Sequence, residues 1–179
     1  MKKLVALLLT LLLAAAPVAA LGEADLTQTN YETLQRALTE TDVPFNTYDD
    51  NQMVDFYFDM DGRCGTVMVN GYAWEDALEF DVIFPDTVPE DRYHELCVLL
   101  MYLNNQIWMS HFYLDWDDHE VCCNAVAFTG SYMPVDGDAA LDALSYAMEA
   151  VDQFGDAIYN VLLDGLDAEQ VIEKLALEE

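Results

Sequence analysis

Acidic residues alternate with tyrosines in two segments of the chain that have a two-residue period. Asp55, Tyr57 and Asp59 occupy every second position, and His111, Tyr113 and Asp115 repeat the pattern. Alternate side chains of a β-strand point to the same face of a sheet. We therefore expect one outer sheet face with nine candidate partner-binding residues: Asp55, Tyr57, Asp59, Met68, Glu79, Asp81, His111, Tyr113 and Asp115.

This set of side chains is suited to binding a basic peptide or a second subunit. Carboxylates accept strong hydrogen bonds from ammonium and guanidinium groups, and tyrosines offer apolar surface with a polar end. Tyr57, Met68, Ile83 and Tyr113 are more apolar than a solvated face requires, so a homodimer through this face is a further hypothesis. The alternative is a solvated sheet face, which antiparallel sheets commonly have.

Two groups of residues contain the side chains that bind metal ions. Asp59-Met60-Asp61-Gly62 resembles part of a calcium loop, but it lacks the third oxygen ligand before the glycine and the later glutamate. Around a predicted hairpin lie possible transition-metal ligands, namely His111, Asp115, Asp117, His119 and Cys122. Chance clustering is expected in so acidic a chain, so we predict no metal site and no cofactor. An extracytoplasmic cation-binding acidic protein is the alternative function.

The sequence predicts no catalytic residue. It lacks the GxSxG, HExxH and phosphate-loop patterns of hydrolases and phosphoryl-transfer enzymes. Pairs of carboxylates can support glycoside hydrolysis, but with 34 acidic residues such pairs are unavoidable. A small hydrolase is therefore the third and least favoured hypothesis, and we expect a protein that is not an enzyme.

The overall charge restricts the class of partner. The 179 residues include 34 Asp and Glu but only six Lys and Arg, which gives a formal charge of −28. Such a charge repels nucleic acid and anionic lipid, and it favours cationic partners such as basic proteins, polyamines and metal ions. Abundant aromatic and aliphatic residues distinguish this chain from an acidic disordered one.

The first residues match a secretory signal peptide. Lys2 and Lys3 precede an apolar stretch from Leu4 to Ala16, and small residues close it, so cleavage is expected after Ala20. Cleavage after Gly22, an uncleaved anchor and a buried helix are the alternatives. Removal of residues 1–20 takes away both lysines, which changes the formal charge to −30. We expect an extracytoplasmic protein, secreted or periplasmic, that has no contact with the membrane after cleavage.

The elements that must position the candidate residues are read from periodicity and turn signals. A linker at 21–27 precedes a helix at 28–41. Asp61-Gly62, Asn70-Gly71 and Asp117-Asp118 are typical of turns, and Pro85 is expected to end a strand. Phe58 and Trp116 are expected to face inward, and Asn104 or Asn105 to end a helix in a left-handed conformation. The remaining elements are strands at 45–48, 53–60, 64–69, 78–84, 112–116 and 121–127, and helices at 89–104, 136–165 and 168–176.

Four cysteines leave the disulfide question open. Cys64, Cys97, Cys122 and Cys123 allow three full pairings in an oxidising compartment, and free buried cysteines are the alternative. Because Cys122 and Cys123 are adjacent in a predicted strand, their side chains point to opposite faces. We expect Cys122 on the outer face.

The order of elements is α-β-β-β-(β)-α-β-β-α, which predicts an α+β domain with two layers, an antiparallel sheet and helices on one of its faces. The second half carries a resemblance. A helix ends in Leu103-Asn104-Asn105, and the run from Ile107 to Asp115 follows, which leads into the aromatic strand. A second strand then precedes a long helix that contains Asp152. This organisation resembles the YbjN-type domain family, named for bacterial sensory transduction regulators, whose fold is similar to that of the type III secretion chaperones.

The resemblance covers residues 28–165, and residues 166–179 form a short C-terminal helix and tail. It implies a non-catalytic role in binding a protein or peptide, and it supplies no catalytic residues. Ser110 stands where the family often has glycine, and Asn124 and Ala125 stand where it often has Arg or Lys. No ligand site is therefore carried over. A signal peptide also distinguishes this chain from chaperones that act inside the cell.

Overall fold

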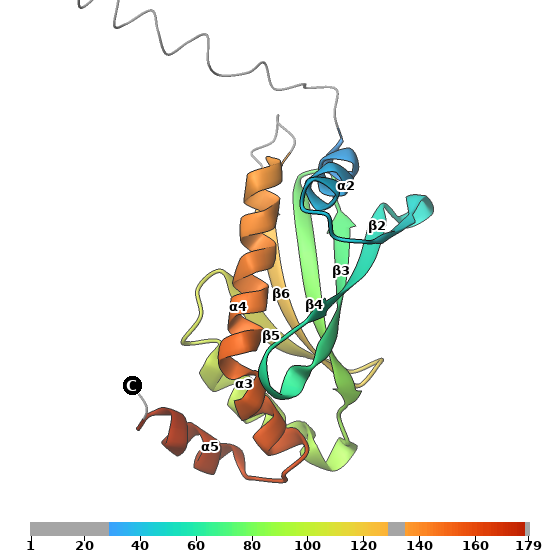
Figure 1. The fold of residues 1–179 in the computed structure, drawn as a ribbon. Helices are drawn as coiled ribbons and strands as arrows, with labels where there is room; N and C mark the ends of the chain where they lie inside the picture. Colours follow the sequence, from blue (N-terminus) through green and yellow to red (C-terminus); the bar gives the residue numbers. More distant parts are fainter. Residues whose placement is uncertain (1–28, 129–134, 178–179) are drawn as a thin grey trace, which may run out of the picture.

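The computed structural model describes residues 29–128 and 135–177, so the predicted signal peptide and linker lie outside the described residues. The chain has the predicted α+β architecture (Figure 1). Its elements are α2 (Asn30–Glu40), β1 (Asn46–Tyr48), η1 (Asp49–Asn51), β2 (Met53–Asp59), η2 (Gly62–Cys64), β3 (Thr66–Ala73), β4 (Ala77–Thr87), η3 (Glu90–Arg92), α3 (Tyr93–Leu103), β5 (Ser110–Asp115), β6 (Glu120–Phe128), α4 (Gly137–Leu162) and α5 (Ala168–Leu175).

The strands form a six-stranded antiparallel sheet in the order β1-β2-β3-β4-β6-β5. Alternation of apolar and polar residues gives the sheet one buried face, which we term the inner face. In β4, for example, Leu78, Phe80 and Val82 are fully buried on this face. Helices α2, α3 and α4 pack against the inner face. Helix α4 runs along the sheet, and α2 lies beside the first turns of α4 (Figure 1).

Local sequence explains where the helices begin and end. Thr29 and Glu32 form a capping box at the start of α2, and Asp136 accepts a hydrogen bond from the backbone N–H of Asp138 at the start of α4. Gly165, with a φ of +72°, follows the end of α4. The side chains of Thr29, Glu32 and Asp136 satisfy backbone groups that the helices leave unpaired. Among the described residues, no helix is long and apolar enough to cross a membrane.

The prediction of a turn at Asn70-Gly71 is wrong, because Gly71 lies inside β3. A Cβ atom at Gly71 would lie 3.0 Å from Val54 Cγ2 and 3.3 Å from Leu34 Cδ2. The glycine therefore allows α2 to pack closely on the sheet, and the chain instead turns between Trp74 and Ala77. A glycine that serves close packing and a glycine that serves a turn have the same signature in a single sequence.

Three further predictions about strand ends are wrong. Pro85 does not end β4, which continues to Thr87 through a register shift where a proline costs no ladder hydrogen bond. Trp116 is 59% exposed because β5 ends at Asp115, and its ring packs on Tyr93 at 4.9 Å between centroids. Phe58 pairs with Val67 on the inner-face register, but at the end of the sheet it is 42% exposed.

The four cysteines are unpaired in the described structure. Cys123 is buried on the inner face, and Cys64 lies in η2 rather than in a strand. Cys122 lies on the opposite face, as predicted, yet only 3% of it is exposed. The centre of that opposite face is therefore itself covered by the longer side chains around it.

Candidate binding surface

The strand register brings all nine predicted site residues onto the face of the sheet that α2, α3 and α4 leave uncovered, which we term the outer face. Residues in register lie side by side across the strands, so the outer face can be described in rows. Tyr57 pairs with Met68, Met68 with Ile83, Ile83 with Cys122 and Cys122 with Tyr113. The same register aligns Asp55, Asn70, Asp81, Asn124 and His111 in a neighbouring row.

These rows define three bands on the outer face. The tyrosine band consists of Tyr57, Met68, Ile83, Cys122 and Tyr113. The polar band consists of Asn46, Asp55, Asn70, Asp81, Asn124 and His111. The tryptophan band lies on the other side of the polar band. It consists of the row Tyr48, Met53, Tyr72, Glu79 and Val126, together with Trp74 and Phe128, which lie two residues beyond Tyr72 and Val126; Glu79 is its one acid.

Asn124 organises the centre of the polar band. Its side-chain amide is only 4% exposed, and it donates hydrogen bonds of 2.7 Å to Glu79 Oε1 and 2.8 Å to Asp81 Oδ1. Both amide hydrogens thus go to carboxylates. The second oxygen of Glu79 accepts a hydrogen bond of 2.7 Å from the indole N–H of Trp74. The amide therefore holds two acidic side chains in fixed positions at the middle of the face.

Asp55 is held in a similar way at the edge of the polar band. Asn46 Nδ2 donates to one of its oxygens at 2.6 Å, and the Tyr48 hydroxyl donates to the other at 2.7 Å. Beyond the tyrosine band, Asp59 accepts a hydrogen bond of 2.7 Å from Thr66. Neighbouring polar groups thus hold Asp55 and Asp59 in fixed orientations.

Burial shifts the pKa of several groups on this face. It raises the pKa of Asp81 above its usual value, although hydrogen bonds from Asn124 and Tyr113 oppose the shift. Burial also raises the pKa of Tyr113, and nearby Cys122 and Asp81 raise it further. The pKa of Cys122 rises to about 12, chiefly through burial, so the thiol is uncharged at neutral pH. The cause of these shifts is the burial of the centre of the face, where Cys122 and Asn124 are 3% and 4% exposed.

The two apolar bands expose aromatic side chains to solvent. Tyr57 is 62% exposed in the tyrosine band, and Phe128 and Trp74 are 77% and 54% exposed in the tryptophan band. The Trp74 ring stacks on Tyr72 with 6.3 Å between centroids. Exposed aromatics beside ordered polar groups are typical of protein–protein interfaces.

Sequence analysis missed the tryptophan band and the role of Asn124. The two-residue period continues unbroken through Tyr72 and Trp74, but the Asn70-Gly71 turn signal concealed it. Phe128 lies one period beyond Val126, at the end of β6. Asn124 carries no signal of its own in the sequence, because its importance depends on β4 lying beside β6.

Positive charge is absent from the strands of the outer face within the described residues. The four described Lys and Arg residues all lie outside the strands: Arg36 in α2, Arg63 in η2, Arg92 in η3 and Lys174 in α5. Arg63 donates two hydrogen bonds to Asp164, at 2.7 and 3.0 Å, and thereby joins η2 to the end of α4. Acids therefore dominate the outer face: Asp55, Asp59, Glu79, Asp81, Asp115 and Glu120.

The free edge of β5 is partly closed by Asn104. Its amide donates to the carbonyl oxygen of Phe112 at 2.9 Å, and its carbonyl accepts from the Phe112 N–H at 2.7 Å. Asn104 itself is right-handed, with a φ of −64°, and Asn105 has no positive φ either, so the predicted left-handed helix end is wrong. The side chain takes the place of a neighbouring strand, which hinders strand addition at this edge.

The possible metal ligands do not converge. Among residues 29–128 and 135–177, no group of three or more His, Cys, Asp or Glu side chains could hold a metal ion. Asp115 accepts hydrogen bonds from the backbone N–H groups of Asp117 and Asp118, and His119 contacts the Tyr93 hydroxyl through Nδ1. Asp59, in the calcium-loop fragment, is bonded to Thr66. Asp115 thus stabilises a turn, and Asp59 links β2 to β3.

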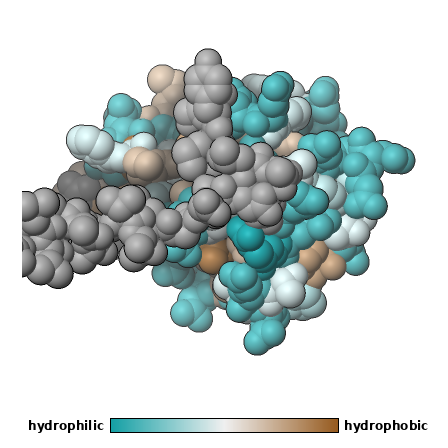
Figure 2. Space-filling model, turned by 90° about the horizontal axis from the view of Figure 1, so that it is seen from above, coloured by the Kyte–Doolittle hydropathy of each residue, from teal (hydrophilic) through white to brown (hydrophobic). Residues whose placement is uncertain are grey.

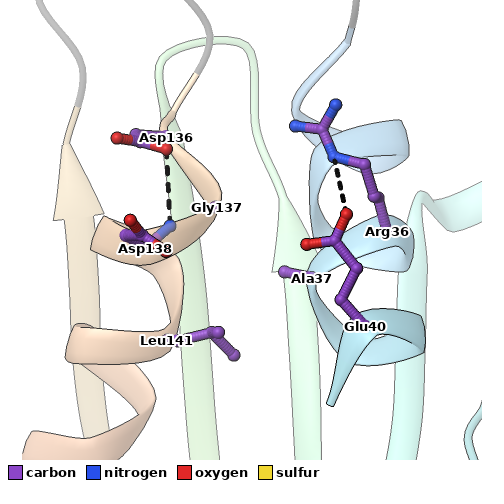
Figure 3. Close-up of a pocket in the computed structure, with 7 residues that line it drawn as sticks. All are labelled: Arg36, Ala37, Glu40, Asp136, Gly137, Asp138 and Leu141. Carbon is purple, nitrogen blue, oxygen red and sulfur yellow. Dashed lines mark hydrogen bonds and ion pairs between the residues drawn. The ribbon is translucent and has the colours of Figure 1, made fainter. Parts of the chain in front are cut away.

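A pocket of about 200 Å³ lies between α2 and the first turns of α4. Figure 3 shows its polar side chains: Arg36 and Glu40 form an ion pair at 4.0 Å on α2, and Asp136 caps α4. Figure 2 views the domain from this end and shows a largely hydrophilic surface with scattered hydrophobic residues. The acids of the pocket serve helix structure, so the pocket supplies no argument for a hydrolase.

Comparison with solved structures relates this geometry to known proteins. The structure is similar to that of YbjN from E. coli, described as a candidate transcription regulator, with a TM-score of 0.54 and 13% sequence identity over 70% of this chain and 90% of YbjN. The fold is YbjN-like. The ExsC–ExsE complex is also similar, with a TM-score of 0.45 and 14% identity over 69% of this chain and 89% of the matched chain. Comparison with family models and with curated proteins gave no match.

The YbjN-like fold confirms the resemblance inferred from the sequence at the level of architecture. A likeness at 13% identity concerns the course of the backbone, and it assigns no ligand and no catalytic residue to this chain. Function must therefore be argued from the outer face itself.

Proposed function

We propose that this protein is an exported, non-catalytic binding module that recognises a protein or basic peptide through the outer face of its sheet. One observation carries the proposal: the uncovered face combines exposed aromatics with ordered carboxylates and has no Lys or Arg on its described strands. Tyr57, Trp74 and Phe128 are all more than half exposed on this one face, and apolar exposure gathered on one face is typical of interaction sites.

A basic partner is favoured over a second copy of the chain. Two outer faces brought together would place carboxylates of like charge opposite one another and remove them from water, which costs free energy. A basic partner instead neutralises these carboxylates, and long-range attraction accelerates its association. Homodimerisation remains the competing form of the proposal, and sedimentation of the purified protein at micromolar concentration distinguishes the two.

Export is proposed from Lys2, Lys3 and the apolar stretch that ends before Ala20. Mass spectrometry of the protein recovered from outside the cytoplasm should give a chain that begins at Leu21. A chain that retains Met1 and stays with the membrane would indicate an uncleaved anchor.

Selection of a random peptide library on the purified protein tests the binding role. We expect enriched peptides to carry Lys or Arg and to lose at least tenfold in affinity when Tyr57→Ala and Tyr113→Ala are combined. Tyr146→Ala is the matched control, because it removes a tyrosine that is 39% exposed on α4, in the helical layer. Enriched peptides that bind the double variant as tightly as the unaltered protein would remove the outer face from the proposal.

A further inference from the structure

The three bands follow one another along the direction of the strands. In β3, Tyr72, Asn70 and Met68 occupy the tryptophan, polar and tyrosine bands in turn, each two residues from the next. Two residues of a strand span about 6.8 Å, so the tryptophan and tyrosine bands lie about 14 Å apart with the polar band midway. Along this direction the outer face is thus first aromatic, with Glu79 as the one acid of that band, then polar around Asp81 and Asn124, and then apolar.

We propose that the partner is an extended segment that places one arginine between two apolar side chains, each separated from it by a single residue. This inference rests on the proposed function, since it specifies what the outer face binds. Alternate side chains of an extended segment recur at about 6.8 Å, which equals the spacing of the bands. A segment lying along the strands therefore sets its first, third and fifth side chains on the tryptophan, polar and tyrosine bands.

The centre of the polar band is suited to a guanidinium group. Glu79 and Asp81 are held 2.7 and 2.8 Å from the same Asn124 amide, so their carboxylates lie close together at the middle of the face. A guanidinium group donates up to five hydrogen bonds in a planar fork and is more weakly hydrated than an ammonium group, which favours it at a partly buried site. Tyr72 and Tyr113 flank this centre and can offer aromatic faces to a cation.

The apolar bands offer matching contacts on either side. Ile83 and Cys122 form a buried floor in the tyrosine band, and Met68 and Tyr57 border it. In the tryptophan band, Trp74 is fixed by its stack on Tyr72 and its hydrogen bond to Glu79. Rigid aromatic side chains lose little entropy on binding, so they are effective anchors for an apolar side chain of the partner.

The test is a titration of the isotope-labelled protein with short synthetic peptides, followed by NMR. The first peptide has the core Leu-Ser-Arg-Ser-Leu, the second has the same composition in the order Leu-Leu-Arg-Ser-Ser, and the third replaces arginine with uncharged citrulline. We expect the first peptide to bind at least tenfold more tightly than the other two. Equal binding of the first and second peptides would overturn the inference, and so would tighter binding of a helical peptide with the same three side chains.

Asp81→Asn separates recognition of the arginine from general acidity. We expect this variant to lower the affinity for the arginine peptide at least tenfold and the affinity for the citrulline peptide less than twofold. Asp142→Asn, which removes the same charge from an exposed position on α4, should change neither. An equal loss for Asp81→Asn and Asp142→Asn would show that only net charge matters and would overturn the inference.

The outcomes for the two proposals are distinguishable. If library-selected peptides depend on Tyr57 and Tyr113 but ignore the spacing of arginine and leucine, the binding role stands and the spacing inference falls. If selected peptides ignore both tyrosines, the proposed function itself fails. Absence of binding by all three synthetic peptides overturns the spacing inference alone.

Discussion

Asn124 is the position at which the smallest chemical change should have the largest effect on the outer face. Asn124→Asp conserves shape but replaces an amide that donates to Glu79 and Asp81 with a third carboxylate. A hydrogen bond to a charged group contributes roughly 1.5–3 kcal/mol to stability, so loss of two such bonds should cost about 3 kcal/mol or more at neutral pH. That is a large share of the roughly 5–15 kcal/mol that stabilises a typical domain.

The cost should depend on pH in a predictable direction. The introduced carboxyl is almost fully buried between two carboxylates, so its pKa in the folded protein lies above its value in the unfolded chain. A group of this kind stabilises the fold below its unfolded pKa and loses that contribution as the pH rises through its folded pKa. The destabilisation by Asn124→Asp should therefore be greatest at neutral pH and smaller in mild acid.

Urea unfolding followed by circular dichroism, at pH 7.5 and at pH 4.5, measures both effects. Asn51→Asp is the matched control, because it makes the same substitution at an exposed residue of η1 and should change stability by less than about 0.5 kcal/mol. A loss below about 1 kcal/mol for Asn124→Asp at pH 7.5, or an equal loss at the two pH values, would refute the role assigned to the amide.

Three further variants test other parts of the structure. Gly155→Ala places a Cβ atom 2.3 Å from Cys64 Sγ, so this variant should be less stable by about 1–2 kcal/mol in thermal unfolding. In a Cys64→Ala background the clash is gone, and the same change should stabilise the protein by up to about 1 kcal/mol, because alanine favours a helix more than glycine does. An effect of the same sign in both backgrounds would contradict the close contact of Gly155 with Cys64. Asp81→Asn should raise stability at neutral pH, because burial raises the pKa of Asp81 and its ionised form is costly, and a urea series should show this gain shrinking as the pH falls through that pKa. Asn104→Ala should cost roughly 1–3 kcal/mol and increase light scattering by opening the β5 edge; unchanged stability and scattering would argue against the clamp.

Much of the fold follows from local sequence. The two-residue period of β2, β4 and β6 reflects one buried and one uncovered face. Asp136 marks the start of α4 because it accepts a hydrogen bond from an unpaired backbone N–H, and Gly165 follows the end of α4 because its positive φ favours glycine. The wrong predictions come from residues whose local preference yields to packing between distant segments. Gly71 has a turn signature, but contacts with Leu34 and Val54 decide its use. Asn104 has a helix-end signature, but Phe112 determines the position of its side chain.

The candidate site shows the same division. Periodicity alone placed Asp55, Tyr57, Asp59, Met68, Glu79, Asp81, His111, Tyr113 and Asp115 on one face, and the strand register bears out that placement. Their role in binding remains a prediction. The hydrogen-bonded centre around Asn124 depends on β6 pairing with β4, although β5 and α3 separate these strands in sequence. Strand order is a non-local property, and the period of one segment carries no information about it.

The most direct test of the central claim is NMR mapping of the site that a library-selected basic peptide occupies on the isotope-labelled protein. The account predicts that the largest shifts fall on Tyr57, Met68, Asp81 and Tyr113, while Met101 and Trp108, which are 71% and 93% exposed outside the sheet, stay unchanged. Shifts concentrated around Met101 and Trp108, with the outer face undisturbed, would contradict it.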